Sequence, residues 1–452
     1  MTALLDRPVL VYGLGVTGLA AARALVARGH QVRLVDDAPS AAAVEFAARL
    51  DLELETDRDV SRLVRGVGSV LPTPGLADRH PVLAAAQAIG LPVISEFDLA
   101  AEWDDRPVVA ITGTNGKTTV TTLVCEVLLA SGRNAVDAGN TEVPLVEAID
   151  DPGVEVFVVE ASSFRLGHSR HFAPDVGCWL NFGPDHLDVH ADLLAYETAK
   201  SRIWSGQSPD QIAVANADDP VVMSHATGPA RVVTYGLSNE ASPSGESSRP
   251  DYFSDDSTLR RPDGSIIVEV RDLFRSLPHD QSNVLATAAC CDPLGATREG
   301  TSAALAAFRG LSHRVELVGR SDGISWFDDS KATTPHATAA AVAGFRSVVL
   351  IAGGRNKGLD LSVLGRLETV RAVVGIGESA QEVVAAFGDR PRTVAGSMAE
   401  AVSEAARLAR PGDAVLLSPG CASFDWYRNY SERGDDFLKC VRDLVIFGGG
   451  GT

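Results

Sequence analysis

Three short apolar runs in this chain each lead directly into a cluster of glycines. The runs are Val9–Tyr12, Val108–Ile111 and Ser347–Ala352, and alanine-rich stretches of helical character alternate with the apolar runs along most of the chain. A strand that runs into a glycine turn and then a helix is typical of nucleotide-binding α/β domains. The pattern therefore predicts an α/β fold of three such domains around mostly parallel sheets, with Rossmann-like first and last domains and a P-loop central domain. The expected boundaries are 1–97, 98–310 and 311–452.

The charge of the chain excludes several classes of partner. Its 452 residues include 40 Lys and Arg against 59 Asp and Glu, a formal net charge of −19. Such an acidic chain repels nucleic acids and anionic membranes, so we expect neither as a partner and expect any phosphate to be held by local glycine loops and single cations.

No stretch approaches the about 18 consecutive apolar residues of a spanning helix, no signal peptide is recognisable, and the six cysteines form no C-x-x-C pair. We therefore expect a cytoplasmic protein, and a monomer.

The first glycine cluster, Gly13–Gly18, has the form G-x-G-x-x-G between the strand Val9–Tyr12 and a helix expected over Thr17–Arg28. Asp36 ends the next expected strand, Gln31–Val35. By motif alone this is a dinucleotide fingerprint. A dinucleotide domain needs two βαβ halves, however, and this segment ends near residue 95, so a single nucleotide fits its size better. A glycine turn without a ligand is the alternative.

The second glycine cluster resembles a P-loop. It reads Gly113-Thr114-Asn115-Gly116-Lys117-Thr118-Thr119 and stands between a strand and a helix that extends through Leu129. Backbone amides and the helix N-terminus would face phosphate, Lys117 would reach the β- and γ-phosphates, and Thr118 would offer its hydroxyl to Mg²⁺. Ile111 stands where the strict motif has its first glycine.

Candidate metal ligands follow the next two expected strands. Glu160 ends the strand Val154–Val159, where a carboxylate is well placed to hold Mg²⁺. The alternative is an ordinary acidic residue at the end of a strand, with no role in metal binding. His186 could ligate a divalent ion, and Asp185 and Asp188 could support it, but an isolated histidine is as often structural.

Lysines are rare and their positions are informative. Only five of the forty basic residues are lysines, namely Lys117, Lys200, Lys331, Lys357 and Lys439. A lysine retained among so many arginines suggests a requirement for a primary amine or a compact ammonium. Lys200 could pair with a neighbouring acid, or its neutral amine could take up CO₂ as a carbamate.

The stretch Ser238–Pro262 is rich in Ser, Pro and acidic residues, and we expect it to be an exposed loop between strands.

In this order, the motifs resemble those of the Mur ligases, ATP-dependent amide-forming enzymes of peptidoglycan precursor synthesis. The resemblance rests on Gly113–Thr119, Glu160–Ser163, Asp185–Asp188 and the pair Tyr196 and Lys200. C-terminal motifs resemble the branch of the family that adds D-glutamate; they are His313-Arg314, Asp329–Thr333, Gly353–Lys357, Ser418–Asp425 and Asn429–Gly434.

The resemblance implies a substrate for each domain. It implies ATP and two Mg²⁺ ions, with Lys200 carbamylated, and the catalytic residues Lys117, Lys200, His186 and Glu160. The metal residues it implies are Thr118, Glu160, His186 and Lys200. The ATP-site residues are Gly113, Thr114, Asn115, Gly116, Lys117, Thr118, Thr119, Asn283, Arg314 and Asp329. The first domain would hold the uridine diphosphate of a muramoyl substrate through Gly15, Val16, Thr17, Asp36, Asp37, Pro74 and Gly75. In the central domain, Asn140 and Ser162 would face the muramoyl part of this substrate, and His186 would complete the site. D-Glutamate would contact Lys331, Thr333, Lys357, Ser423, Phe424 and Tyr430.

The chain departs from the family pattern at two places. His279-Asp280 stands where the family has His-Asn before the adenine-site asparagine, and Arg355-Asn356 precede Lys357. Two alternative functions remain at this point: a related ligase that adds another amino acid or a glutamate tail, and a nicotinamide-dependent oxidoreductase that uses Gly13–Gly18.

Overall fold

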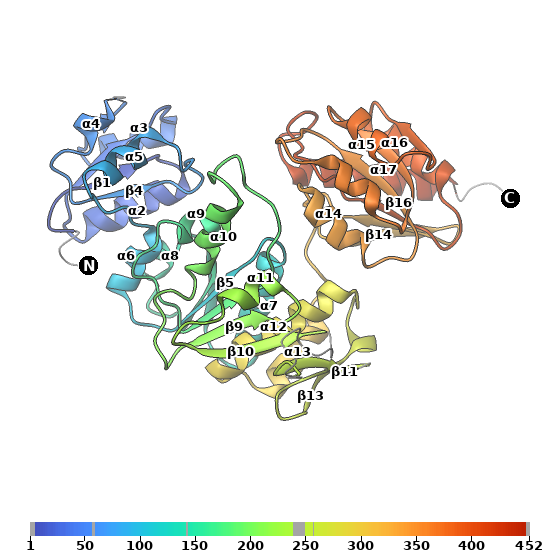
Figure 1. The fold of residues 1–452 in the computed structure, drawn as a ribbon, viewed down its shortest axis with the longest axis horizontal. Helices are drawn as coiled ribbons and strands as arrows, with labels where there is room; N and C mark the ends of the chain where they lie inside the picture. The colour runs from blue at the N-terminus through green and yellow to red at the C-terminus, as the bar shows by residue number, and fades with distance from the viewer. Residues whose placement is uncertain (1–4, 57–58, 142, 238–248, 256, 449–452) are drawn as a thin grey trace. The chain divides into compact units, whose positions relative to one another are not determined.

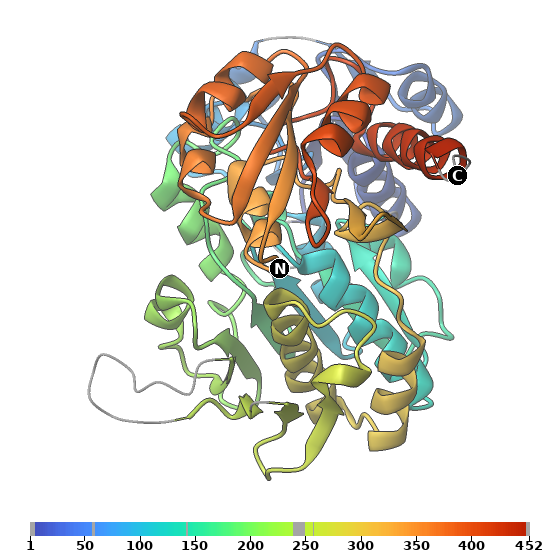
Figure 2. The ribbon, with the colours of Figure 1, turned by 90° about the vertical axis from the view of Figure 1, so that its right-hand side faces the viewer.

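A computed structural model describes residues 5–56, 59–141, 143–237, 249–255 and 257–448. It confirms the predicted mixed α/β fold with three mostly parallel sheets (Figures 1 and 2). The chain divides into two compact units. The first comprises Met1–Ser276 with Asp280–Phe308, and the second Leu277–His279 with Arg309–Thr452. The first two sheets lie in the first unit, and the division into three domains at residues 97 and 310 stays a prediction.

The first sheet has four parallel strands in the order β3-β2-β1-β4. Its predicted opening strand is confirmed at Val9–Tyr12, and the predicted helix lies at Val16–Ala27. Helices cover both faces, because alternate side chains of the strands point to opposite sides and the strands at Val9–Tyr12 and Ser69–Pro72 are buried on both. The strands are β1 Val9–Tyr12, β2 Val32–Val35, β3 Leu54–Glu55 and β4 Ser69–Pro72; α2 Val16–Ala27 and α3 Ala41–Arg49 pack on one face, and α4 Val60–Leu63 and α5 Pro81–Ala88 on the other.

The central sheet has nine strands in the order β13-β12-β11-β10-β9-β8-β5-β7-β6, parallel from β6 to β11. One apolar core lies between one face of the sheet and helices α7, α12 and α13, and a second lies between the other face and α6, α8 and the segment that contains Trp204. The strands are β5 Val108–Thr112, β6 Ala135–Gly139, β7 Val156–Glu160, β8 Val176–Trp179, β9 Ile212–Asn216, β10 Arg231–Gly236, β11 Tyr252–Asp255, β12 Thr258–Arg260 and β13 Ile266–Glu269. The helices are α6 Glu96–Trp103, α7 Lys117–Ala130, α8 Leu145–Ala148, α9 Ser163–Leu166, α10 Leu193–Ser201, α11 Pro220–His225, α12 Pro278–Cys291 and α13 Arg298–Ala307.

The expectation of a continuous loop over Ser238–Pro262 was wrong in its second half. Strands β11 and β12 form an antiparallel pair there, and Figure 2 shows this edge of the sheet in olive at the bottom of the view. Tyr252, Phe253 and Leu259 are buried, so a few apolar side chains anchor short strands within a polar stretch. Residues 238–248 lie outside the described residues.

The third sheet has the order β14-β15-β19-β16-β17-β18, and only β14 is antiparallel to its neighbour. Helices α16 and α17 cover one face, and α14, α15 and a 3₁₀ segment at Leu361–Arg366 cover the other. The elements are β14 Glu316–Ser321, β15 Ile324–Asp328, β16 Val348–Gly353, β17 Val370–Ile376, β18 Arg392–Val394, β19 Ala414–Leu417, α14 Pro335–Val342, α15 Ala380–Ala386, α16 Met398–Leu408 and α17 Tyr430–Gly448. Among the described residues, no helix has the length and apolar character needed to cross a bilayer.

Candidate active site

Three neighbouring strands of the central sheet bring the main candidate residues together. Strand β5 runs between β7 and β8, so the P-loop after β5, Glu160 at the end of β7 and the 181–188 loop after β8 share one edge. Ligands of open parallel sheets bind at the carboxyl ends of the strands, where the strand order changes direction. Because β6 and β7 lie on one side of β5 and β8 on the other, this edge is such a position.

The P-loop is fastened to the 181–183 loop through hydrogen bonds. Asn181 accepts from the backbone N–H of Asn115 at 2.8 Å and donates its amide to the carbonyl of Asn115 at 3.1 Å. Thr114 donates its hydroxyl to the carbonyl of Gly183 at 3.1 Å. Gly116 begins α7 with φ of 83°, and a side chain there would press on Asn283. These bonds leave the amides at the start of the 14-residue helix α7 facing the strand edge.

Glu160 is buried and holds two expected site residues. Its Oε2 accepts from the Thr118 hydroxyl at 2.7 Å, and its Oε1 accepts from the Asn140 amide at 3.0 Å. Ser162, two residues later, caps the short helix α9 through the backbone N–H of Arg165. A hydroxyl and a carboxylate at this spacing are oxygen donors suited to Mg²⁺.

His186 lies in the left-handed backbone region with φ of 55°, above the edge of Phe164. Burial, together with the positive charge of nearby Lys117, lowers the pKa of its imidazole to about 4. The ring is therefore neutral at pH 7, the state needed for metal ligation. Its Nε2 lies 3.5 Å from a carboxylate oxygen of Asp185, which makes Asp185 rather than Asp188 its partner.

Lys117 and Lys200 converge on one backbone oxygen. Their Nζ atoms donate to the carbonyl of Gly113 at 2.8 and 2.7 Å. Lys200 is only 1% exposed, and its Nζ lies 4.7 Å from the centre of the Tyr196 ring. Burial, and then the charge of Lys117, holds the pKa of Lys200 well below its usual value, which favours its neutral amine.

The departure at position 280 has a structural explanation. Asp280 forms a two-pronged ion pair with Arg275, with both nitrogen–oxygen distances at 2.7 Å. The carboxylate thus orders the start of α12, the helix that carries Asn283.

The glycine turn of the first sheet is closed by Asp36. This carboxylate accepts from the backbone N–H groups of Leu14 at 2.6 Å and Ala38 at 2.9 Å, so it shapes the turn. Asp37 accepts from the Tyr12 hydroxyl at 2.8 Å. The remaining expected residues of this site are Gly15 and the exposed Val16 at the turn, the buried Thr17 in α2, and Pro74 and Gly75 after β4.

The first unit also contains a second group of polar contacts, which was not predicted from the sequence. The His190 ring bridges the hydroxyl of Ser163 at 2.9 Å and the carboxylate of Asp78 at 3.2 Å. Asp78 also accepts from the backbone N–H of Ala191 at 3.3 Å. A cavity of about 440 Å³ lies beside these residues and is also lined by Phe164, Leu194 and Arg202. His190 lies two residues after the motif Asp185–Asp188, but nothing in the sequence indicates that Asp78 is its partner.

The expected ribose and D-glutamate residues lie in the second unit. Asp329 accepts from the Ser418 hydroxyl at 2.7 Å, and burial raises its pKa to about 7. The Lys331 ammonium lies 3.8 Å from the centre of the Tyr430 ring. Arg314 and Thr333 lie half-buried on the neighbouring loops.

Backbone hydrogen bonds join two loops that carry further residues expected to bind D-glutamate. Arg355 and Ala422 exchange backbone hydrogen bonds, and Gly354, with φ of 129°, has no room for a side chain beside the carbonyl of Ala422. Ser423 is buried, Phe424 is exposed, and the Lys357 ammonium lies 6.0 Å from the centre of the Phe424 ring.

The departure ahead of Lys357 also has local roles. Arg355 pairs with Glu378 at 2.8 Å, and Asn356 exchanges hydrogen bonds with the backbone of Leu359. Both side chains order the loop that presents Lys357.

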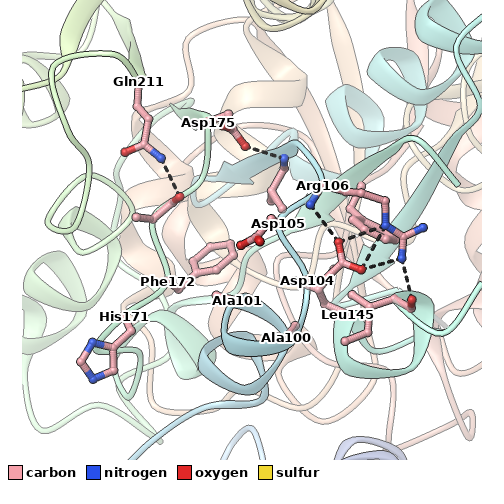
Figure 3. A pocket seen from close by; sticks show the side chains of 14 residues that line it. Ala100, Ala101, Asp104, Asp105, Arg106, Leu145, His171, Phe172, Asp175 and Gln211 are labelled. Carbon is pink, nitrogen blue, oxygen red and sulfur yellow. Dashed lines mark hydrogen bonds and ion pairs between the residues drawn. The ribbon is translucent and has the colours of Figure 1, made fainter. Parts of the chain in front are cut away.

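Two other places fit a ligand less well. A cavity of about 240 Å³ lies at the amino ends of β5 and β7, opposite the P-loop edge, and Figure 3 shows the Arg106 guanidinium there already bonded to Asp104. In the second unit, His313, Glu316 and Asp328 offer ligand atoms within 4.8 Å of one another. The His313 ring is hydrogen-bonded to Asp328 at 2.7 Å, a contact that raises the pKa of His313 and marks an ion pair rather than a metal centre.

Comparison with known proteins identifies the family to which the chain belongs. Residues 7–95 match the Mur ligase MurD-like N-terminal domain, 111–291 the Mur ligase middle domain, and 313–421 the Mur ligase glutamate ligase domain. A UDP-N-acetylmuramoylalanine–D-glutamate ligase from Frankia casuarinae is 43% identical over 96% of this chain and 94% of its own length. The chain belongs to the Mur ligase family. A relative of the same name from Desulfosudis oleivorans is 39% identical, with 97% of each chain covered.

Solved structures agree on the fold. A Mur ligase from Thermotoga maritima, UDP-N-acetylmuramate-alanine ligase MurC, superposes with a TM-score of 0.56 at 17% identity and covers 97% of this chain and 100% of its own. A pseudomurein peptide ligase type C from Methanothermus fervidus gives a TM-score of 0.61 at 18% identity, again over 97% and 100%. The glycine turn lies within the matched N-terminal domain, residues 7–95, so the match favours a Mur ligase over the nicotinamide-dependent oxidoreductase.

Proposed function

We propose that this chain is an ATP-dependent amide ligase that joins D-glutamate to UDP-N-acetylmuramoyl-L-alanine through an acyl phosphate. The observation that carries the proposal is the meeting of Lys117, Thr118 and Glu160 at one strand edge, in a chain whose relatives of that name align over nearly its full length. The glutamate ligase domain match over 313–421 supports an amino-acid site in the second unit.

The P-loop side would hold ATP. The Lys117 ammonium and the first amides of α7 are the positive groups that the β- and γ-phosphates require. Asn283, which lies against Gly116, would contact the adenine, and Arg314 and Asp329 would contact the phosphate and ribose. Gly113, Thr114, Asn115 and Thr119 complete the expected ATP-binding set.

Two Mg²⁺ ions would fit the donor set at this edge. Thr118 and Glu160 supply oxygens 2.7 Å apart, and His186 supplies a neutral imidazole nitrogen. When bound, Mg²⁺ supplies charge neutralisation as the phosphoryl group is transferred.

Lys200 would provide a further ligand as a carbamate. Its depressed pKa favours the neutral amine, whose lone pair attacks CO₂ and forms a carbon–nitrogen bond while one N–H proton leaves to solvent. The product is a carboxylate-like group beside the P-loop, close to the shared carbonyl of Gly113.

The chemistry then needs positioning more than acid–base catalysis. An oxygen of the substrate carboxylate attacks the γ-phosphorus, the β–γ bridging bond breaks, and ADP leaves. The D-glutamate amine attacks the acyl carbon, loses a proton, and phosphate departs with the former carboxylate oxygen. Lys331 and Lys357 offer a cation for each carboxylate of D-glutamate, and Thr333, Ser423, Phe424 and Tyr430 would complete its site.

We further propose a cytoplasmic monomer that acts on these small molecules and binds neither nucleic acid nor membrane. The net charge of −19 supports this, because it opposes polyanionic partners.

Isotope transfer tests the proposed reaction. UDP-N-acetylmuramoyl-L-alanine labelled with ¹⁸O in its carboxylate is incubated with the chain, ATP, Mg²⁺ and D-glutamate. The proposal predicts one ¹⁸O in each released phosphate. Unlabelled phosphate, or labelled phosphate without amide product, would refute it.

A further inference from the structure

The guanidinium of Arg165 joins three segments of the first unit. Arg165 lies in α9 and is only 6% exposed. Its Nη2 donates to the Thr17 hydroxyl at 2.9 Å, and its Nη1 donates to the side-chain oxygen of Asn140 at 3.0 Å. Its Nε lies 3.1 Å from a carboxylate oxygen of Glu96. No site motif in the sequence assigns a role to this residue.

These bonds continue to the P-loop without interruption. Asn140 donates its amide nitrogen to one oxygen of Glu160 at 3.0 Å, and the other oxygen of Glu160 accepts from Thr118 at 2.7 Å. The two ends of the Asn140 amide are thus fixed by opposite charges, with the oxygen toward Arg165 and the nitrogen toward Glu160. One hydrogen-bonded chain therefore runs from the glycine turn of the first sheet to the start of α7.

Glu96 holds the guanidinium in place. Its second carboxylate oxygen accepts from the backbone N–H of Val146 at 3.0 Å, and the side chain is 1% exposed. Burial raises the pKa of Glu96 and lowers that of Arg165, and the attraction between them opposes both shifts. Because Glu96 approaches the Nε edge, the two terminal nitrogens of Arg165 face the neutral oxygens of Thr17 and Asn140.

We propose that Arg165 is a positioning residue for the uridine-diphosphate substrate. This inference rests on the proposed function and on the expectation from the family resemblance that Thr17 and Asn140 contact that substrate. Arg165 holds the Thr17 hydroxyl and the Asn140 amide in one orientation, next to the glycine turn. Only a rigid planar fork reaches both oxygens at once, so a lysine cannot replace it.

The test compares Arg165→Lys and Arg165→Gln with the native protein. The lysine variant keeps a positive charge beside Glu96, so it tests the fork geometry even where the glutamine variant does not fold. We expect the KM for UDP-N-acetylmuramoyl-L-alanine to rise about 10- to 100-fold in Arg165→Lys, the size expected for a lost charge-assisted hydrogen bond. We expect the KM for ATP to change less than about threefold, because no atom of Arg165 contacts the P-loop directly.

Arg170→Lys is the matched control. Arg170 is an exposed arginine five positions along the chain that donates to the carbonyl of Val93, and its replacement should leave both KM values unchanged. Calorimetric titration with UDP alone gives a second readout that does not depend on catalysis, and should show the same weakening in Arg165→Lys.

The outcomes separate the two proposals. A folded, active Arg165→Lys with an unchanged KM for the uridine substrate, or an equal rise in both KM values, would overturn the role of Arg165. A native protein without D-glutamate-dependent phosphate release would instead refute the proposed function.

Discussion

Arg433 is buried in the second unit, and we predict that it stabilises both loops of the expected D-glutamate site. It lies in α17 and is 1% exposed. Its Nε and Nη2 donate to the hydroxyl and carbonyl of Ser330 at 2.9 and 2.8 Å, and its Nη1 donates to the carbonyl of Cys421 at 3.1 Å. Burial lowers the pKa of Arg433 to about 10, so it remains charged at neutral pH. Lys331 and Ser423 lie one and two residues beyond these contacts.

The magnitude follows from the three hydrogen bonds. Arg433→Met removes them and leaves the carbonyls of Ser330 and Cys421 buried without this donor. An unmade buried hydrogen bond costs about 1–3 kcal/mol, so for three of them we expect a loss of roughly 3–9 kcal/mol in the free energy of unfolding of the second unit. That is a large part of the about 5–15 kcal/mol that stabilises a typical domain.

Hydrogen–deuterium exchange measures this locally, in peptides that cover Ser330–Thr333 and Gly420–Phe424, together with the KM for D-glutamate. We expect faster exchange in both peptides and a higher KM in Arg433→Met. Arg442→Met replaces an exposed arginine of the same helix and should change neither. If Arg433→Met exchanged as slowly as the native protein and kept its KM, the assigned role of these bonds would be wrong.

Two further predictions concern buried ionisable groups. Lys200→Ala should lose nearly all ligase activity, and a short carboxylate such as acetate should restore part of it by taking the place of the carbamate; a fully active Lys200→Ala would contradict the carbamate. Asp329 has a pKa of about 7, above its usual 3.8, so the folded state binds the proton more tightly and stability falls as pH rises between these values. Asp329→Asn should lack this fall, and its stability relative to the native protein should rise by up to about 4 kcal/mol from pH 4 to pH 8; urea unfolding at several pH values measures it, and parallel pH profiles for the two proteins would contradict the buried carboxyl.

The parts of the fold that depend on neighbouring residues could be predicted from the sequence. The strand Val9–Tyr12 has the predicted bounds, and those at Val108 and Val348 are displaced by one residue at most, because an apolar run that ends in glycine carries its own boundaries. Glu160 was predicted to be placed to hold Mg²⁺ because it ends a strand of the P-loop domain, and the carboxyl ends of parallel strands share one edge of a sheet. Strands β11 and β12 were missed because three buried apolar side chains within a polar stretch leave no periodic signal.

The residues that position the site could not be predicted, since their partners lie far along the chain. Arg165 meets Thr17 across 148 positions, and Arg433 meets Ser330 across 103. That Asp36 faces a ligand stays a prediction, whereas the closure of its own glycine turn by its carboxylate could not be predicted, because it depends on backbone geometry. The lowered pKa of His186 likewise depends mainly on burial, which arises only in the folded chain.

The most direct test of the central claim is phosphate release from ATP. The purified chain is given Mg²⁺ and UDP-N-acetylmuramoyl-L-alanine, with D-glutamate, L-glutamate or L-lysine added in turn. The account predicts release with D-glutamate alone. Release with another amino acid would keep the ATP site and contradict the assigned specificity, and no release with any of the three would contradict the ligase itself.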